Sequence, residues 1–225
     1  SQMTFSCYET GKQHAGRDAL RKVCEGLGID FSDFILNYAE PYKHREISLP
    51  CMVDQHLAQF IGYYMGDGSV EQDRITFFEQ RKEVALEYRK KFGSYFHIQP
   101  SYKHRISKNY HQLRFTSRPL VRFILQEFPE AKKTSDFSVP LKIVQSPPDV
   151  VAGFLRGIFD AEGSVHTTNN HGVGIALINK TFIQQLQLLL LRFSIISSFY
   201  EYDNKKNPYS KIPIFKLHIT DNESL

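Results

Sequence analysis

The stretch FIGYYMGDGSV at residues 60–70 returns later in the chain as FLRGIFDAEGSV at residues 154–165. In both copies a glycine, an acid and Gly-Ser-Val follow in the same order, so that Gly62 matches Gly157 and Asp67 matches Glu162. A long repeat of this kind predicts two similar half-domains that each bring one carboxylate to a shared site. One acid in each half suits a substrate with two-fold symmetry, such as duplex DNA.

The repeat continues beyond the motif, which makes a chance match a poor explanation. ITFFEQ at residues 75–80 corresponds to IALINK at residues 175–180, and LRFT at residues 113–116 corresponds to LHIT at residues 217–220. Asp54 and Asp149 are candidate N-caps for motif helices that run to Gly66 and Ala161, each followed by a glycine. The motif acids are therefore expected at helix ends.

The periodicity of apolar residues predicts the rest of each unit. In the first unit it indicates a helix over residues 82–92, strands over 95–102 and 112–116, and a closing helix over 119–128. In the second unit it indicates a helix over residues 181–193 and strands over 196–202 and 212–220. Each unit is thus expected to be αββαββ, with the closing helix present in the first unit alone. Either the chain is a fragment of a longer protein, or it ends early and works asymmetrically.

At these residues the chain resembles the LAGLIDADG homing endonucleases, in the single-chain form with two motif copies. The resemblance covers about residues 50–225, and residues 60–68 and 155–163 occupy the nine positions that name the family. It implies an α+β fold of two pseudo-symmetric αββαββα half-domains that pack through their motif helices and form a saddle over double-stranded DNA. It also implies a monomer that hydrolyses phosphodiester bonds with a divalent metal at a long, non-palindromic site.

The chemistry of the motif is consistent with this resemblance. Gly62 and Gly157 share a helical face with the small residues four positions later, which allows two helices to approach closely. Asp67 and Glu162 would then lie side by side, which is unfavourable unless a cation lies between them. Carboxylate oxygens suit Mg²⁺, and Mn²⁺ or Ca²⁺ could occupy the same site. The expected ligands are Asp67, Glu162, Gly66 and Ala161.

Other catalytic residues are implied by the resemblance. Lys133 stands where relatives place a lysine that stabilises phosphate charge, with Lys132 as the alternative. Gln80 and Asn179 fall near the strand end where relatives place a polar side chain, although Glu79 could replace Gln80. Asp160 is left out of the catalytic set because its counterpart is Met65, and an acid in one copy is expected to hydrogen-bond at the helix end.

Basic residues are concentrated on the predicted strands. The net charge is +4 with a sequence pI near 8.8, and from Arg74 to Arg118 there are eleven Lys and Arg against three acids. Basic and polar side chains on a sheet face can enter the major groove and contact bases and phosphates. The expected DNA-binding residues are Arg74, Lys103, Arg105, Lys108, Arg114, Lys180, Lys205, Lys206, Lys211 and Lys216.

The remaining segments define the expected domain organisation. Residues 1–50 are a small helical extension with helices over 17–26 and 31–38, residues 51–128 and 149–225 are the half-domains, and residues 129–148 are an ordered linker. Three cysteines without CxxC spacing favour reduced thiols and an intracellular protein. The sequence contains no apolar run of 20 residues, so it does not predict a membrane span.

Two alternatives to a free-standing endonuclease stay open. One is a non-catalytic DNA-binding regulator on the same fold, against which the acids in both copies argue. The other is the endonuclease part of an intein, or an intron-encoded maturase that assists RNA splicing. Self-splicing by this chain is not expected, because it lacks a terminal His-Asn.

Overall fold

A computed structural model describes residues 17–31, 34, 47–132, 137–167, 171–205 and 211–220 of the chain. The chain divides into two compact units, Ser1–His44 and Arg45–Leu225. Within the first unit, the predicted helix over residues 17–26 is observed as α2 (Arg17–Leu27). Its end is followed by Gly28 in the left-handed conformation, with φ of 66°. The second predicted helix, over residues 31–38, falls largely outside the described residues.

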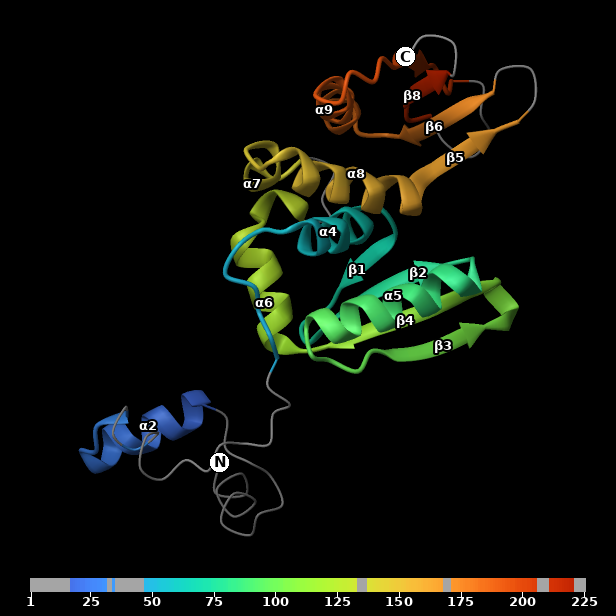
Figure 1. The fold of residues 1–225 in the computed structure, drawn as a ribbon. Helices are drawn as coiled ribbons and strands as arrows, with labels where there is room; N and C mark the ends of the chain where they lie inside the picture. The colour runs from blue at the N-terminus through green and yellow to red at the C-terminus, as the bar shows by residue number, and fades with distance from the viewer. Residues whose placement is uncertain are drawn as a thin grey trace. The chain divides into compact units, whose positions relative to one another are not determined.

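The unit Arg45–Leu225 contains both half-domains, and the order of elements expected from the repeat is confirmed (Figure 1). The elements of the first half are α4 (Gln55–Asp67), β1 (Gly68–Val70), β2 (Arg74–Glu79), α5 (Lys82–Tyr95), β3 (Ser101–Arg105), the 3-10 turn η1 (Ile106–Lys108), β4 (Tyr110–Thr116) and α6 (Arg118–Glu127). The elements of the second half are α8 (Pro148–Glu162), β5 (Gly163–His166), β6 (Gly172–Leu177), α9 (Lys180–Leu191), β7 (Ser198–Tyr202) and β8 (Ile214–Thr220). The linker holds η2 (Pro129–Ala131) and α7 (Leu141–Val144).

The described residues form two four-stranded antiparallel sheets with the same topology. Their strand orders are β1-β2-β4-β3 and β5-β6-β8-β7. The two motif helices, α4 and α8, lie next to each other between the sheets, and α5 covers one face of the first sheet (Figure 1). This is the pseudo-symmetric α+β fold that the sequence predicts. The predicted absence of a closing helix from the second half concerns residues after Thr220, which lie outside the described part of the chain.

Each half builds its core between a sheet and its helices. In the first half the core is aromatic, because the ring of Phe60 on α4 lies 4.8–5.2 Å from four phenylalanine rings. These rings belong to Phe77, Phe92, Phe96 and Phe115. In the second half aliphatic residues such as Ile175, Leu186 and Leu217 take most of this role. Both motif helices are therefore anchored from the sheet side.

Several predicted boundaries are wrong. Asp54 caps α4 and accepts hydrogen bonds from the backbone of His56 and Leu57, but Asp149 lies inside α8, whose N-cap is Pro147. The motif helices end one residue later than predicted, at the acids themselves, and the glycines that follow are extended rather than left-handed. The strand predicted over residues 95–102 begins only at Ser101, because α5 continues to Tyr95.

Nothing in the described residues resembles a membrane-spanning helix, since none of their helices combines the required length with the required apolar composition.

Candidate active site and nucleic-acid interface

The motif helices α4 and α8 are in backbone contact. A Cβ atom added to Gly62 would lie 2.3 Å from the carbonyl oxygen of Phe154, and one added to Gly157 would lie 2.2 Å from that of Gln59. No side chain fits at such distances, so these two glycines are required by the approach of the helices. The predicted role of Gly62 and Gly157 in close packing is therefore observed.

The stripe of small residues is one turn longer than the sequence analysis recognised. A Cβ atom added to Gly153 would lie 2.3 Å from the carbonyl oxygen of Gln55. Gly153 corresponds to Ala58 in the first copy, four residues before Gly62, and Ala58 is fully buried. The signal was present as small residues at every fourth position of both motif helices.

These contacts bring the two acidic helix ends together. Residues 55, 62 and 66 of α4 meet residues 153, 157 and 161 of α8 in the same order, so the helices run parallel. A Cβ atom added to Gly66 would lie 2.5 Å from the Ala161 Cβ and 3.7 Å from Oε1 of Glu162. Asp67 and Glu162 are the last residues of their helices, with Asp67 exposed and Glu162 half-buried. The fold therefore places one carboxylate from each half at the same end of the helix pair.

The residues at this end suit a hard divalent cation. Two carboxylates and the carbonyl groups of Gly66 and Ala161 offer oxygen donors alone, which Mg²⁺, Mn²⁺ and Ca²⁺ prefer. Within the described residues there is no group of three or more His, Cys, Asp or Glu side chains that could hold a metal ion. Two acids match an ion such as Mg²⁺, which takes its other ligands from water and substrate phosphates.

Glu79, at the end of β2, faces the first motif helix, whereas Gln80 is exposed. Glu79 is 5% exposed, and its carboxylate accepts hydrogen bonds from Tyr63 Oη at 3.0 Å and from the Arg81 guanidinium at 2.9–3.0 Å. Burial opposes ionisation of Glu79, but the bonds from Arg81 leave its pKa below the ordinary value. Burial, with the charges of Glu79 and Asp67, raises the pKa of Tyr63. Tyr63 therefore stays a neutral donor close to both carboxylates.

At this strand end, the register of the two sheets aligns the two copies differently from the sequence repeat. Gly68 pairs with Phe77, and Gly163 pairs with Ile175, so Phe77 corresponds to Ile175. Asn179 is then the counterpart of Arg81, not of Gln80. Its side chain accepts from the Phe182 amide at 2.9 Å and donates to the Phe137 carbonyl at 2.7 Å. The amide of Asn179 thus caps α9 and ties it to the linker.

Of the two candidate lysines in the linker, Lys133 lies outside the described residues. Lys132 follows η2 and is exposed.

The register of the first sheet gathers four predicted DNA-binding residues on one face. Ile75, Phe77, Leu113 and Phe115 point into the core, so their neighbours along each strand point away from it. On β4 and β3, Arg114 faces Ser101, and Lys103 faces Gln112. We call the face directed away from α4 and α5 the open face of the first sheet. Its basic residues are Arg74, Lys103, Arg105 and Arg114.

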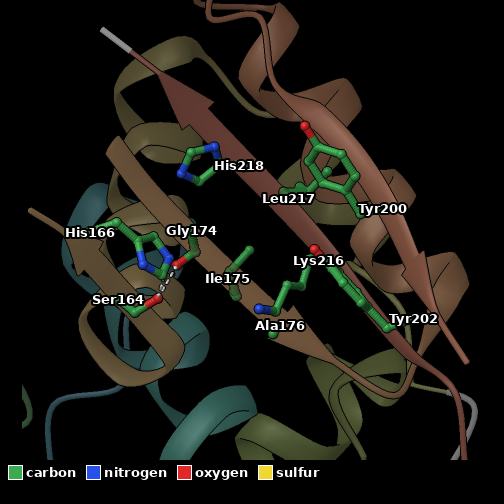
Figure 2. A pocket seen from close by; sticks show the side chains of 10 residues that line it. All are labelled: Ser164, His166, Gly174, Ile175, Ala176, Tyr200, Tyr202, Lys216, Leu217 and His218. Carbon is green, nitrogen blue, oxygen red and sulfur yellow. Dashed lines mark hydrogen bonds between the residues drawn. The ribbon is translucent and has the colours of Figure 1, made fainter. Parts of the chain in front are cut away.

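The corresponding open face of the second sheet is a groove (Figure 2). It has a volume of about 370 Å³, and its floor is formed by Gly174 and Ala176 of β6. Thr76 and Phe78 occupy these positions in the first sheet, so the groove exists because the second sheet has smaller side chains there. The walls carry His166, Tyr200, Tyr202, Lys216 and His218.

The other predicted basic residues lie elsewhere. Lys180 forms an ion pair with Glu201 at 3.0 Å and lies over the ring of Phe215, which places it on the helix-covered side of the second sheet. Lys205 is 85% exposed and pairs with Asp203, and Lys211 donates to the carbonyl of Lys205. Lys108 ends η1 between β3 and β4, and Lys206 lies outside the described residues. Lys216 alone among the described second-half candidates lines the groove.

Two pseudo-symmetric halves joined by parallel, acid-ended helices define a known class of protein. A sequence model of the LAGLIDADG-like domain matches residues 54–126 and again residues 149–225. The chain therefore belongs to the LAGLIDADG family, with two copies of the domain, as the motif predicted.

Relatives with measurable sequence identity are much longer proteins. The chain is 34% identical over 223 residues to the glutamine–fructose-6-phosphate aminotransferase of Methanocaldococcus jannaschii, which is 96% of this chain and 20% of that protein. It is also 34% identical over 102 residues to a probable translation initiation factor IF-2 of the same organism, which is 45% of this chain and 9% of the factor. The chain thus spans a fifth or less of these relatives.

Solved structures with the same fold include the homing endonuclease I-DmoI in complex with DNA and Mn. It has a TM-score of 0.54 and 13% identity over 75% of this chain and 90% of that one. The N-terminal LAGLIDADG domain of DUF199/WhiA has a TM-score of 0.51 and 16% identity over 84% of this chain and 81% of that one. Identities this low establish a shared fold alone, so the activity has to be inferred from the residues of the site.

Proposed function

We propose that this chain is a metal-dependent endonuclease that cuts both strands of duplex DNA at a long, non-palindromic site. One observation carries the proposal: two parallel helices end together in acids, Asp67 and Glu162, between two sheets with polar open faces. Because the two open faces carry different side chains, the two halves of the recognised site would differ in sequence.

The residues at the helix ends have distinct tasks in this reaction. Asp67 and Glu162, with the carbonyl groups of Gly66 and Ala161, would hold the divalent ion. When bound, such an ion stabilises charge on the leaving oxygen and activates a water molecule. Structures of I-DmoI with DNA and Mn, Ca or Mg support a divalent ion of this kind.

Several polar residues near the helix ends would assist. We propose that Gln80, which is exposed just after β2, orients the attacking water. We propose that Lys133 neutralises charge on the phosphate. Asn179 would act by fixing the start of α9. On the open faces, cationic side chains would hold the DNA backbone, and polar ones would contact base edges.

The relatives support a role in gene mobility. An aminotransferase and an initiation factor share no activity, yet each contains a segment 34% identical to this chain. A similar segment inside unrelated proteins is what insertion of one element into different host genes leaves behind. We therefore propose the endonuclease part of an intein-type insertion, which acts inside the cell as a monomer because one chain supplies both halves.

A DNA-binding regulator without nuclease activity is the second candidate, since the fold alone does not define an activity. The acids at both helix ends favour the nuclease.

The proposal is tested by selecting cleaved sequences from a randomised duplex library with Mg²⁺, followed by variants on the selected target. Asp67→Asn and Glu162→Gln should each reduce double-strand cleavage below detection and leave DNA affinity largely unchanged, because they remove a ligand charge and preserve shape. Asp149→Asn is the matched control, since Asp149 lies in the first turn of α8, at the opposite end from Glu162.

Normal cleavage by either variant would show that Asp67 and Glu162 do not form the proposed metal site. A chain that binds duplex DNA but cleaves no member of the library would favour the regulator.

A further inference from the structure

Asp160, which has no acidic counterpart in the first motif, joins the two halves through hydrogen bonds. Its carboxylate accepts from Tyr88 Oη on α5 and from Gln59 Nε2 on α4, the latter at 3.3 Å. Gln59 and Tyr88 are each 1% exposed, and Gln59 Nε2 also donates to Tyr88 Oη at 3.1 Å. Two buried polar side chains of the first half thus converge on one carboxylate of the second.

A third group from the first half reaches the same turn of α8. Nη2 of Arg81 donates to the backbone carbonyl of Asp160 at 2.5 Å, while the same guanidinium binds Glu79. Arg156, one turn earlier on α8, lies 3.6 Å from the Asp160 carboxylate. Asp160 lies two residues before Glu162, so the last turn of α8 is held by side chains of the opposite half.

The corresponding turn of α4 is supported differently. In the repeat, Met65 is the counterpart of Asp160, and Phe154 is the counterpart of Gln59. When α5 and α9 are aligned at their N-caps, Arg81 and Asn179, Leu186 is the counterpart of Tyr88. These three residues are buried, with exposures of 3%, 0% and 0%. The pseudo-symmetry of the side chains therefore breaks at this place: polar residues of the first half bond to α8, whereas the counterparts of these residues are apolar and cannot form such bonds to α4.

We propose that Gln59, Tyr88 and Arg81 are positioning residues that hold the last turn of α8, and through it Glu162, by way of Asp160. This inference rests on the proposed nuclease function. A buried hydrogen-bonded cluster is directional, and Met65, Phe154 and Leu186 cannot form one, so the second half holds the end of α4 less precisely than the first half holds the end of α8. The two DNA strands are then cut at different rates.

Burial, followed by the bond to Asp160, raises the pKa of Tyr88, so its hydroxyl group remains a donor at neutral pH. The ring of Tyr88 also packs on Tyr63, with centroids 4.9 Å apart, so Tyr88→Phe removes the donor and keeps the packing. This substitution is the cleanest probe of the cluster.

The test compares Tyr88→Phe with Leu186→Met, a volume-conserving change at the counterpart position. With each strand of the selected target end-labelled, the ratio of the two strand-cleavage rate constants should change about tenfold in Tyr88→Phe, as for residues that orient metal ligands. The ratio should stay at the unmodified value in Leu186→Met. Asp160→Asn, which keeps one acceptor oxygen, should give an intermediate ratio. An unchanged ratio in Tyr88→Phe would overturn the proposal.

Amide hydrogen exchange supplies a readout that does not need cleavage. In Tyr88→Phe, amide exchange should become faster over residues 159–162 of α8 and remain unchanged over residues 64–67 of α4. Equal effects at both helix ends would contradict a specific role for the cluster. If the unmodified chain cuts no DNA, the nuclease proposal fails, and the exchange result still decides whether the cluster holds α8.

Discussion

Tyr64 is fully buried in the first motif helix, and among the described residues its hydroxyl group has no hydrogen-bond partner. Burial raises the pKa of Tyr64 to about 12, so the hydroxyl group is neutral. Removing this polar group from water on folding still destabilises the folded state. The counterpart in the second motif is Phe159. We predict that Tyr64→Phe raises the free energy of unfolding by about 1 kcal/mol, measured by urea denaturation.

Tyr63→Phe is the matched control at the neighbouring position. Its hydroxyl oxygen lies 2.9 Å from the carbonyl oxygen of Phe78 and 3.0 Å from the Glu79 carboxylate, which share its one proton, so removing it should lower the free energy of unfolding by about 1 kcal/mol or more. A loss of stability in Tyr64→Phe would mean that its hydroxyl group has a partner, such as an internal water.

Single residues show where sequence patterns are reliable and where they are not. Asp54 was predicted as an N-cap and is one, because its oxygen reaches the first free amides of α4. Asp149 has the same chemistry, but Pro148 takes the first helical position, since its fixed φ suits that place and it has no amide hydrogen to satisfy. Asp160 was expected to hydrogen-bond at a helix end, and it does, although its partners in the other half could not be read from the sequence.

At the scale of elements, the contact between α4 and α8 sets the position of both acids. We predict that Gly157→Ala lowers the free energy of unfolding of the unit Arg45–Leu225 by about 1–3 kcal/mol, because the new methyl group would lie 2.2 Å from the Gln59 carbonyl oxygen and 2.7 Å from the Tyr63 amide nitrogen. Thermal or urea unfolding measures the change.

The same substitution at Gly26 is a control for the change in helix propensity alone, because Gly26 lies in α2 of the unit Ser1–His44 and has no atom within 4 Å of an added Cβ. Gly26→Ala should be neutral or slightly stabilising. Unchanged stability in Gly157→Ala would show that the helices can separate without cost.

Element order was predictable because hydrophobic periodicity repeats in both halves, but the alignment of the copies was not. The turn after β1 is shorter than the turn after β5, and the alignment of Ile75 with Ile175 misplaced the second strand by two residues. A shift of two residues keeps every side chain on its face, so the alternating pattern cannot reveal it. That alignment places Asn179 opposite Glu79, whereas the register of the sheets places it opposite Arg81.

For the whole molecule, the open faces predict how DNA binding depends on salt. Lys103 is exposed on the open face of the first sheet, whereas Lys180 is paired with Glu201 on the helix-covered side of the second. We predict that Lys103→Ala reduces the slope of log affinity against log salt by about 1, because one phosphate contact is lost. Lys180→Ala should leave the slope unchanged, as measured by titration of the selected duplex at several salt concentrations.

A larger loss of slope in Lys180→Ala than in Lys103→Ala would place the DNA on the other side of the sheets. The sequence shows that the strands are rich in basic residues, but the face that each side chain occupies depends on register and on neighbours such as Glu201 and Phe215, which lie far away in the sequence. Local charge therefore predicts a nucleic-acid surface without locating it.

The floor of the groove in the second sheet carries smaller side chains than the same positions of the first sheet, so the two halves differ in how easily they accept a larger side chain on the open face. A Cβ atom added at Gly174 would lie 3.1 Å from Nε2 of the His166 ring and 3.3 Å from the backbone carbonyl oxygen of Leu217. In the first sheet the equivalent space is already filled by Thr76, which is 1% exposed. If the chain binds DNA as proposed, a new target sequence is most easily accommodated at residue 174, where a side chain enters the groove after small shifts of the His166 ring and of the Leu217 carbonyl group.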